Sequence, residues 1–193
     1  MKPNIPKKLQ SLLIETATQR VIRVLCSFPE KEFSLSDLAK EAGVAKPHIG
    51  RILDRLLDVN FIEITKLSKI WRIKANQQEF RFIKAKIIYN LDFLYNSGIV
   101  ELLNVRFENP RAIILFGSFR RGEDLSNSDI DIAIETGTEQ EYQVLGLKEL
   151  AEFERAIHRK IQLHVFHRDH IDLNVFNNIA NGIVLAGFLE VRP

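Results

Sequence analysis

A glycine–serine pair and two aspartates in the second half of the chain are the residues whose types and spacing could do chemistry. Gly117 and Ser118 end one apolar segment, and ten residues later Asp129 and Asp131 lie in another. A glycine before a helix start lets the backbone approach an anion closely and leaves free N–H groups there. Carboxylates two positions apart on a strand share a face and repel each other unless a cation separates them. Mg²⁺ prefers a few carboxylates together with phosphate oxygens, so the pattern favours attack on a nucleoside triphosphate.

The same residues allow a plainer interpretation, in which a glycine turn is followed by an acidic strand edge. An aspartate that faces a core is costly without a metal or hydrogen bonds, and two aspartates are more so. The sequence therefore favours the phosphate and metal site over this alternative.

Alternating helices and strands are expected to position these residues. Apolar runs predict strands at 111–116, 129–134 and 161–166. Helical spacing predicts helices at 99–106, 139–158 and 170–181, the last beginning after Asp169 and ending at Gly182. This alternation is typical of a small α/β layer fold.

The motif resembles that of the nucleotidyltransferases of the DNA polymerase beta superfamily, specifically the minimal nucleotidyltransferase branch. The family signature is Gly-Ser, ten residues, then Asp-x-Asp, often with Arg-Gly shortly after the serine. The matching positions are Gly117, Ser118, Arg121, Gly122, Ser128, Asp129 and Asp131. The resemblance covers about residues 97–190. It implies that a nucleoside monophosphate passes from ATP or another triphosphate to a hydroxyl, and that pyrophosphate leaves.

The resemblance also implies a role for each matched residue. Gly117, Ser118 and Ser128 would bind the nucleotide, and Arg121 would neutralise the leaving group. Asp129 and Asp131 would be the catalytic residues and would bind one or two Mg²⁺. Proteins of the minimal branch often work beside a HEPN-type partner as antitoxins, so such a partner is a further expectation.

The third carboxylate that this superfamily usually carries is absent from its expected position. In the strand expected at 161–166 the matching residue is Gln162, and His164 shares its face. Gln162 could hydrogen-bond a hydroxyl but could not take its proton, whereas His164 could be a base or a metal ligand. The two could equally be a polar pair on a partly exposed strand. Losing a general base costs about 10²–10⁴-fold in rate, so nucleotide binding without turnover stays open.

Three histidines, His164, His167 and His170, recur every third residue and invite a zinc hypothesis. The first lies in an expected strand and the other two in an expected turn and helix start. We therefore do not expect them to converge on one ion.

The first half of the chain predicts three helices followed by a β-hairpin. Helical spacing marks 10–27, and Ser34 to Asp37 fits a capping box for a second helix that ends at Gly43. Lys46-Pro47 begins a third helix. Its expected inward face is Ile49, Ile52, Leu53 and Leu56. Apolar segments on either side of 65–69 predict the hairpin.

This order of elements resembles the winged helix-turn-helix family over about residues 12–75, which implies DNA binding through the third helix and the hairpin tip. The candidate DNA-binding residues are Lys46, His48, Arg51, Arg55, Lys66 and Lys69. Residues 1–80 hold 14 Lys and Arg against 9 Asp and Glu, and the remainder 13 against 16. Asp54 and Asp58 dilute the positive charge of the third helix, so a protein-interaction module remains an alternative.

The sequence thus predicts an α/β (α+β) chain of two domains. Residues 1–76 are expected to form the winged helix, 77–96 a connecting helix, and 97–193 a nucleotidyltransferase fold, a small mixed sheet with flanking helices. The apolar stripe Phe80, Ile83, Ile87, Leu91 and Leu94 of the connecting helix is expected in the core, or in a homodimer contact.

The remaining composition points to the cytoplasm. No apolar stretch approaches the ~20 residues that span a bilayer, and the N-terminus lacks the apolar core of a signal peptide. Cys26 is the only cysteine of the 193 residues. Two hypotheses follow: a Mg²⁺-dependent nucleotidyltransferase with an attached DNA-binding module, or a DNA-binding, antitoxin-like regulator whose nucleotidyltransferase fold binds nucleotide or partner without turnover.

Overall fold

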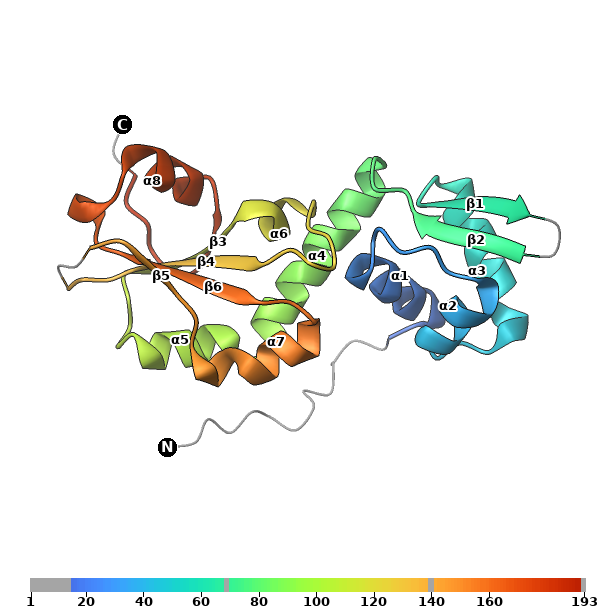
Figure 1. Ribbon diagram of the computed structural model, residues 1–193, viewed down its shortest axis with the longest axis horizontal. Helices are drawn as coiled ribbons and strands as arrows, with labels where there is room; N and C mark the ends of the chain where they lie inside the picture. Colours follow the sequence, from blue (N-terminus) through green and yellow to red (C-terminus); the bar gives the residue numbers. More distant parts are fainter. Residues whose placement is uncertain (1–14, 68–69, 139–140, 192–193) are drawn as a thin grey trace. The chain divides into compact units, whose positions relative to one another are not determined.

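The computed structural model describes residues 15–67, 70–138 and 141–191, which its contacts divide into two units, 15–89 and 90–191. The division falls inside the helix α4 (Phe80–Asn96), which Figure 1 draws in green. This helix confirms the one predicted over 77–96, but it begins later, at Phe80.

The N-terminal unit contains three helices and a hairpin in the predicted order. Its elements are α1 (Ala17–Ser27), α2 (Leu35–Glu41), α3 (Lys46–Asp58), β1 (Ile62–Leu67) and β2 (Ile70–Ala75). The two strands pair antiparallel along their whole length. Figure 1 shows the hairpin beside α3.

Local signals set the bounds of α2 and the start of α3 as the sequence predicts, whereas α1, expected over 10–27, begins at Ala17 after its cap Thr16. The Ser34 hydroxyl accepts a hydrogen bond from the Asp37 N–H at 3.1 Å and caps α2. After α2, Gly43 has φ of +59°, the left-handed conformation that ends a helix most easily at glycine. Pro47 lies in the first turn of α3, where its missing N–H costs nothing.

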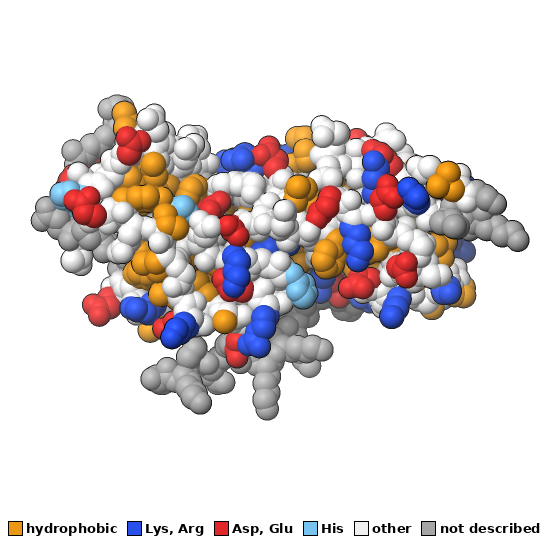
Figure 2. Space-filling model, in the orientation of Figure 1, with side chains coloured by type: hydrophobic (Ala, Val, Ile, Leu, Met, Phe, Trp, Pro, Cys, Tyr) orange, Lys and Arg blue, Asp and Glu red, His pale blue; other side chains and the backbone are white. Residues whose placement is uncertain are grey.

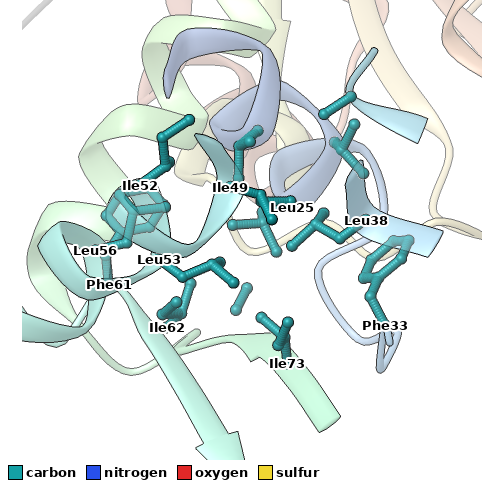
Figure 3. Close-up of a cluster of buried hydrophobic side chains, with 14 of the residues drawn as sticks. Leu25, Phe33, Leu38, Ile49, Ile52, Leu53, Leu56, Phe61, Ile62 and Ile73 are labelled. Atoms are coloured by element: carbon teal, nitrogen blue, oxygen red, sulfur yellow. The ribbon is translucent and has the colours of Figure 1, made fainter. Parts of the chain in front are cut away.

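The predicted inward face of α3 is the centre of this unit's core. Ile49, Ile52, Leu53 and Leu56 are all buried, and Figure 3 shows them turned toward side chains of the other elements. The labelled partners are Leu25, Phe33, Leu38, Phe61, Ile62 and Ile73. One α3 face therefore holds helices and hairpin together, and residues of the opposite face are exposed.

The buried face of α4 differs from the predicted apolar stripe. Phe80 is 67% exposed, whereas Phe82, Lys86, Asn90 and Leu94 are at most 1% exposed. These four residues recur every fourth position and define one helix face. Apolar periodicity missed it because two of its members are polar.

The C-terminal unit is built on a mixed sheet, as predicted, but the sheet has five strands where three were expected. Its strands are β3 (Ala112–Phe116), β4 (Ile130–Glu135), β5 (Gln143–Leu145), β6 (Ile161–Phe166) and β7 (Ile183–Gly187). The order is β5-β6-β4-β3-β7, and only β4 and β6 run parallel. A mixed sheet of this kind fits a nucleotidyltransferase fold.

Helices cover both faces of this sheet. They are α5 (Ile99–Arg106), α6 (Gly117–Arg121), α7 (Ala151–Ile157) and α8 (Leu173–Ala180), with short 3₁₀ turns η1 (Lys148–Leu150) and η2 (Arg168–His170). Figure 1 shows α5 and α7 on one face and α8 on the other. The α8 side packs on Ala112, Ile114, Ala133 and Phe166. Because alternate residues share a face, Asp131 lies on the α8 side of β4.

Two predicted helices of this unit are partly wrong. Where one helix was expected over 139–158, the structure has the strand β5, the turn η1 and the shorter helix α7. Pairing of Gln143–Leu145 with Leu163–Val165 overrides the local helical spacing. The last helix begins at Leu173, because Asp172 rather than Asp169 accepts the first free N–H groups. The strand β7 was not predicted.

No helix among the described residues is both long and apolar enough to cross a membrane.

Candidate active site

The turn from β3 into α6 brings the backbone of Gly117 against the carboxylate of Asp131. The antiparallel pairing of β3 with β4 places Phe116 opposite Asp131. Gly117 has φ of +73°, and a Cβ added there would lie 2.2 Å from Asp131 Oδ2. Only glycine allows both this conformation and this approach. The predicted juxtaposition of glycine turn and acidic strand is therefore present in the structure.

Replacing Gly117 with alanine is expected to disturb the carboxylate more than the fold. The added methyl group strains the left-handed backbone by about 1–2 kcal/mol and displaces the flexible end of Asp131. Nucleotide affinity, measured by titration calorimetry, should fall at least about tenfold, which corresponds to 1.4 kcal/mol. Gly98→Ala is the matched control, because Gly98 has φ of +85° and no atom within 4 Å of the added Cβ. Equal affinity in the two variants would contradict the argument.

Two side chains from β6 donate toward the two aspartates. Gln162 Nε2 lies 2.5 Å from Asp129 Oδ2, and His164 Nε2 lies 3.3 Å from Asp131 Oδ1. The parallel register pairs Asp131 with Gln162 and Ala133 with His164, so these side chains share one face of the sheet. The structure thus brings together both aspartates and both residues considered as substitutes for the third carboxylate.

Two aromatic residues contact the imidazole ring of His164. The Tyr142 hydroxyl lies 2.6 Å from His164 Nδ1, and the Phe116 ring packs edge-to-face on the imidazole at 4.8 Å. Burial, and to a smaller extent the charge of Asp131, raises the pKa of Tyr142 above its ordinary value of 10.0. The Tyr142 hydroxyl and the Asp131 carboxylate thus engage the two ring nitrogens of His164.

The sequence carried no signal for Tyr142. It precedes β5, in a stretch whose local spacing predicted a helix, and only the pairing of β5 with β6 brings it to the site.

The other residues matched to the motif organise the loop that joins α6 to β4. Ser128 Oγ accepts a hydrogen bond from the Leu125 N–H at 2.9 Å. Arg121 is about half exposed and forms an ion pair with Glu123 at 2.6 Å. The carbonyl of Ser118 accepts from the Glu123 N–H at 3.1 Å. Ser128 and Arg121 are thus bonded within this loop.

A buried polar network also anchors this loop to the rest of the unit. Sequence reasoning did not predict this network. Asp124 is fully buried, and Arg159 donates to its Oδ2 through Nε at 3.2 Å and Nη2 at 2.9 Å. Asn90 donates to Asp124 Oδ1 at 2.9 Å and to the Phe119 carbonyl at 2.7 Å. The available signal was an acidic residue inside the motif, Asp124, and an arginine far along the chain, Arg159. No local sequence pattern indicates that these two residues pair.

The donor set of the site fits a hard divalent cation bound together with phosphate oxygens. Within the described residues, no group of three or more His, Cys, Asp or Glu is placed to hold a metal ion by itself. Asp129 and Asp131 supply two carboxylates, the number that Mg²⁺ uses when substrate phosphates complete its shell. They would hold the cation.

Of the three histidines considered for zinc, His164 has partners of its own, whereas His167 and His170 lie side by side. His164 contacts Tyr142 and Asp131, as described above. His167 Nδ1 accepts a hydrogen bond from the Asp169 N–H at 3.4 Å, and its ring lies 5.7 Å from that of His170.

Four of the candidate DNA-binding residues lie exposed on α3: Lys46, His48, Arg51 and Arg55. The last three line a hollow of about 370 Å³ together with Thr16, Ala17 and Thr18 at the start of α1. Lys66 Nζ lies 4.3 Å from the centre of the Trp71 ring, and Lys69 falls outside the described residues. On the face drawn in Figure 2, acidic and basic side chains are interspersed, so the positive charge is not concentrated there.

A larger hollow, of about 450 Å³, lies away from the aspartates. Its lining includes Arg106, Arg111, Thr136 and Gln143, and it contains none of the motif residues. Size alone therefore does not locate the chemistry of this unit.

Comparison with known proteins agrees with the motif. Residues 98–187 match the family described as Polymerase beta, Nucleotidyltransferase, and this stretch contains Gly117, Asp129 and Asp131. No curated protein and no solved structure matches the chain. The match supports a nucleotidyltransferase domain over residues 98–187, and with it a nucleotidyltransferase-type function.

Proposed function

We propose that the C-terminal unit transfers a nucleoside monophosphate from ATP or another nucleoside triphosphate to a hydroxyl acceptor, for example on a protein. The observation that carries the proposal is the close approach of the Gly117 backbone to Asp131, whose carboxylate shares a face with Asp129. A backbone without a side chain beside two carboxylates suits a phosphate chain neutralised by a cation.

Each residue of the motif has a role in this reaction. The backbone at Gly117 and Ser118 binds the β- and γ-phosphates, and Arg121 leaves Glu123 to neutralise the pyrophosphate. Mg²⁺, when held by Asp129 and Asp131, supplies charge neutralisation and polarisation of the α-phosphate. The acceptor oxygen bonds to the α-phosphorus, the bond from that phosphorus to the pyrophosphate oxygen breaks, and the acceptor proton passes to solvent.

A direct test incubates the protein and Mg²⁺ with a lysate and ATP labelled on either the α- or the γ-phosphate. The proposal expects label on an acceptor from α-labelled ATP alone, because the β- and γ-phosphates leave as pyrophosphate. Label from γ-labelled ATP would indicate a kinase-type reaction instead. Absence of label with any nucleoside triphosphate would contradict turnover.

A second candidate function is a regulator that binds nucleotide, or a HEPN-type partner, without turnover. Gln162 favours it, because an amide beside Asp129 cannot accept a proton as a carboxylate can. Binding of a non-hydrolysable nucleotide together with failure of every labelling reaction would favour this candidate.

The N-terminal unit is proposed to be a winged helix that binds DNA through α3. His48, Arg51 and Arg55 project from one exposed side of α3, around the hollow at the start of α1. Cations in this arrangement suit the phosphates of a duplex. A homodimer would present two such surfaces, as paired half-sites require.

Replacing Arg51 with alanine is expected to weaken DNA binding and its salt dependence together. Each lost phosphate contact lowers the slope of log K against log salt by about one. Fluorescence anisotropy with the DNA upstream of the protein's own gene, at several salt concentrations, measures this slope. Arg106→Ala, the same charge change in the C-terminal unit, is the control. An unchanged slope in the Arg51 variant would remove α3 as the contact surface.

A further inference from the structure

We infer that the site holds a single divalent cation for each bound nucleotide, because the two side chains that β6 directs at the aspartates are hydrogen-bond donors and add no negative charge. This inference rests on the proposed nucleotide binding and deepens it by specifying the cation number. Reactions at phosphate commonly use two cations, one on the leaving side and one on the attacking oxygen.

The two donors are Gln162 and His164. The Gln162 amide takes Oδ2 of Asp129 at 2.5 Å, and His164 Nε2 takes Oδ1 of Asp131 at 3.3 Å. Neither donor engages the remaining oxygens, Oδ1 of Asp129 and Oδ2 of Asp131. These two oxygens suit one cation that is also bound to phosphate, and the two donors supply no anionic ligand for a second cation.

Both ring nitrogens of His164 already have partners. Nδ1 lies 2.6 Å from the Tyr142 hydroxyl, and Nε2 lies 3.3 Å from Asp131 Oδ1. The edge-to-face contact with Phe116 at 4.8 Å also restrains the ring. His164 thus acts as a positioning residue for Asp131.

The charge of the site also favours a single cation. A second cation needs further anionic ligands, but Gln162 is neutral. Nor do the described residues place a third acid, histidine or cysteine with the two aspartates in a metal-binding group. Two carboxylates and the triphosphate suffice for one cation, and the attacking hydroxyl receives no cation of its own.

Counting bound Mn²⁺ by electron paramagnetic resonance tests the inference without turnover. The full chain is titrated with Mn²⁺ in the presence of α,β-methylene ATP, which occupies the site but cannot release pyrophosphate. We expect about one Mn²⁺ per bound nucleotide in the natural protein. Gln162→Glu, which replaces the amide by a carboxylate of the same shape, should raise the number to about two. Gln162→Ala removes the donor without adding charge and should keep the number at about one.

Each outcome is decisive. Two Mn²⁺ per nucleotide in the natural protein, or an unchanged number in Gln162→Glu, overturns the single-cation inference while nucleotide binding stands. If Gln162→Glu fails to fold, the counts for the natural protein and for Gln162→Ala still decide. Failure of the natural protein to bind the nucleotide at all overturns the proposed function as well.

Discussion

Replacing Asp131 with asparagine is expected to lower nucleotidyl transfer about 10³-fold, since several kcal/mol of transition-state stabilisation depend on the cation that this carboxylate holds. Asparagine preserves the shape of the side chain beside Gly117 but removes its charge. The substitution also gives His164 Nε2 a weaker acceptor. Transfer of α-labelled nucleotide to the acceptor in a lysate measures the effect.

The matched control is Asp169→Asn, because the Asp169 side chain is 75% exposed and lies outside the site. This variant should transfer nucleotide at the natural rate. An Asp131→Asn variant that retained more than about a tenth of the activity would show that the cation is held elsewhere.

Replacing Asp124 with alanine is expected to destabilise the C-terminal unit by about 3–5 kcal/mol, since it removes the carboxylate that accepts two hydrogen bonds from the buried guanidinium of Arg159. The side chains of both residues are at most 1% exposed. The change also removes one of the two acceptors of Asn90 and frees the loop that leads to Asp129. Removing one partner of a buried ion pair costs more than the pair itself contributes.

Hydrogen exchange of the β4 and β6 amides should report this loss as faster exchange. Trp71, the only tryptophan, lies in the N-terminal unit, so its fluorescence transition in urea should stay unchanged. Glu123→Ala, an exposed neighbour, is the control for the loop. The double variant Asp124→Leu with Arg159→Met should regain most of the stability, because apolar residues can replace a buried pair. Slow exchange in Asp124→Ala would contradict the assigned role.

The central part of the site could be predicted from the sequence because its chemistry is local. Gly117 follows the apolar run that forms β3 and Asp131 lies in the apolar run that forms β4, and the antiparallel pairing of these strands places Phe116 opposite Asp131. The α3 core was equally predictable, since Ile49, Ile52 and Leu53 follow the period of a single helix.

What could not be predicted depends on contacts between distant segments. Tyr142 reaches His164 only through the pairing of β5 with β6, which local spacing cannot reveal. Asp124 and Arg159 are 35 positions apart and meet only in the folded unit. The polar members of the buried α4 face, Lys86 and Asn90, were hidden because an apolar pattern does not count them.

Titration calorimetry with α,β-methylene ATP, with and without Mg²⁺, tests the central claim most directly. We predict binding that requires the cation and that is lost in the double variant Asp129→Asn, Asp131→Asn. Binding of equal strength without the cation, or in the double variant, would contradict the claim that these two carboxylates hold a metal–nucleotide complex.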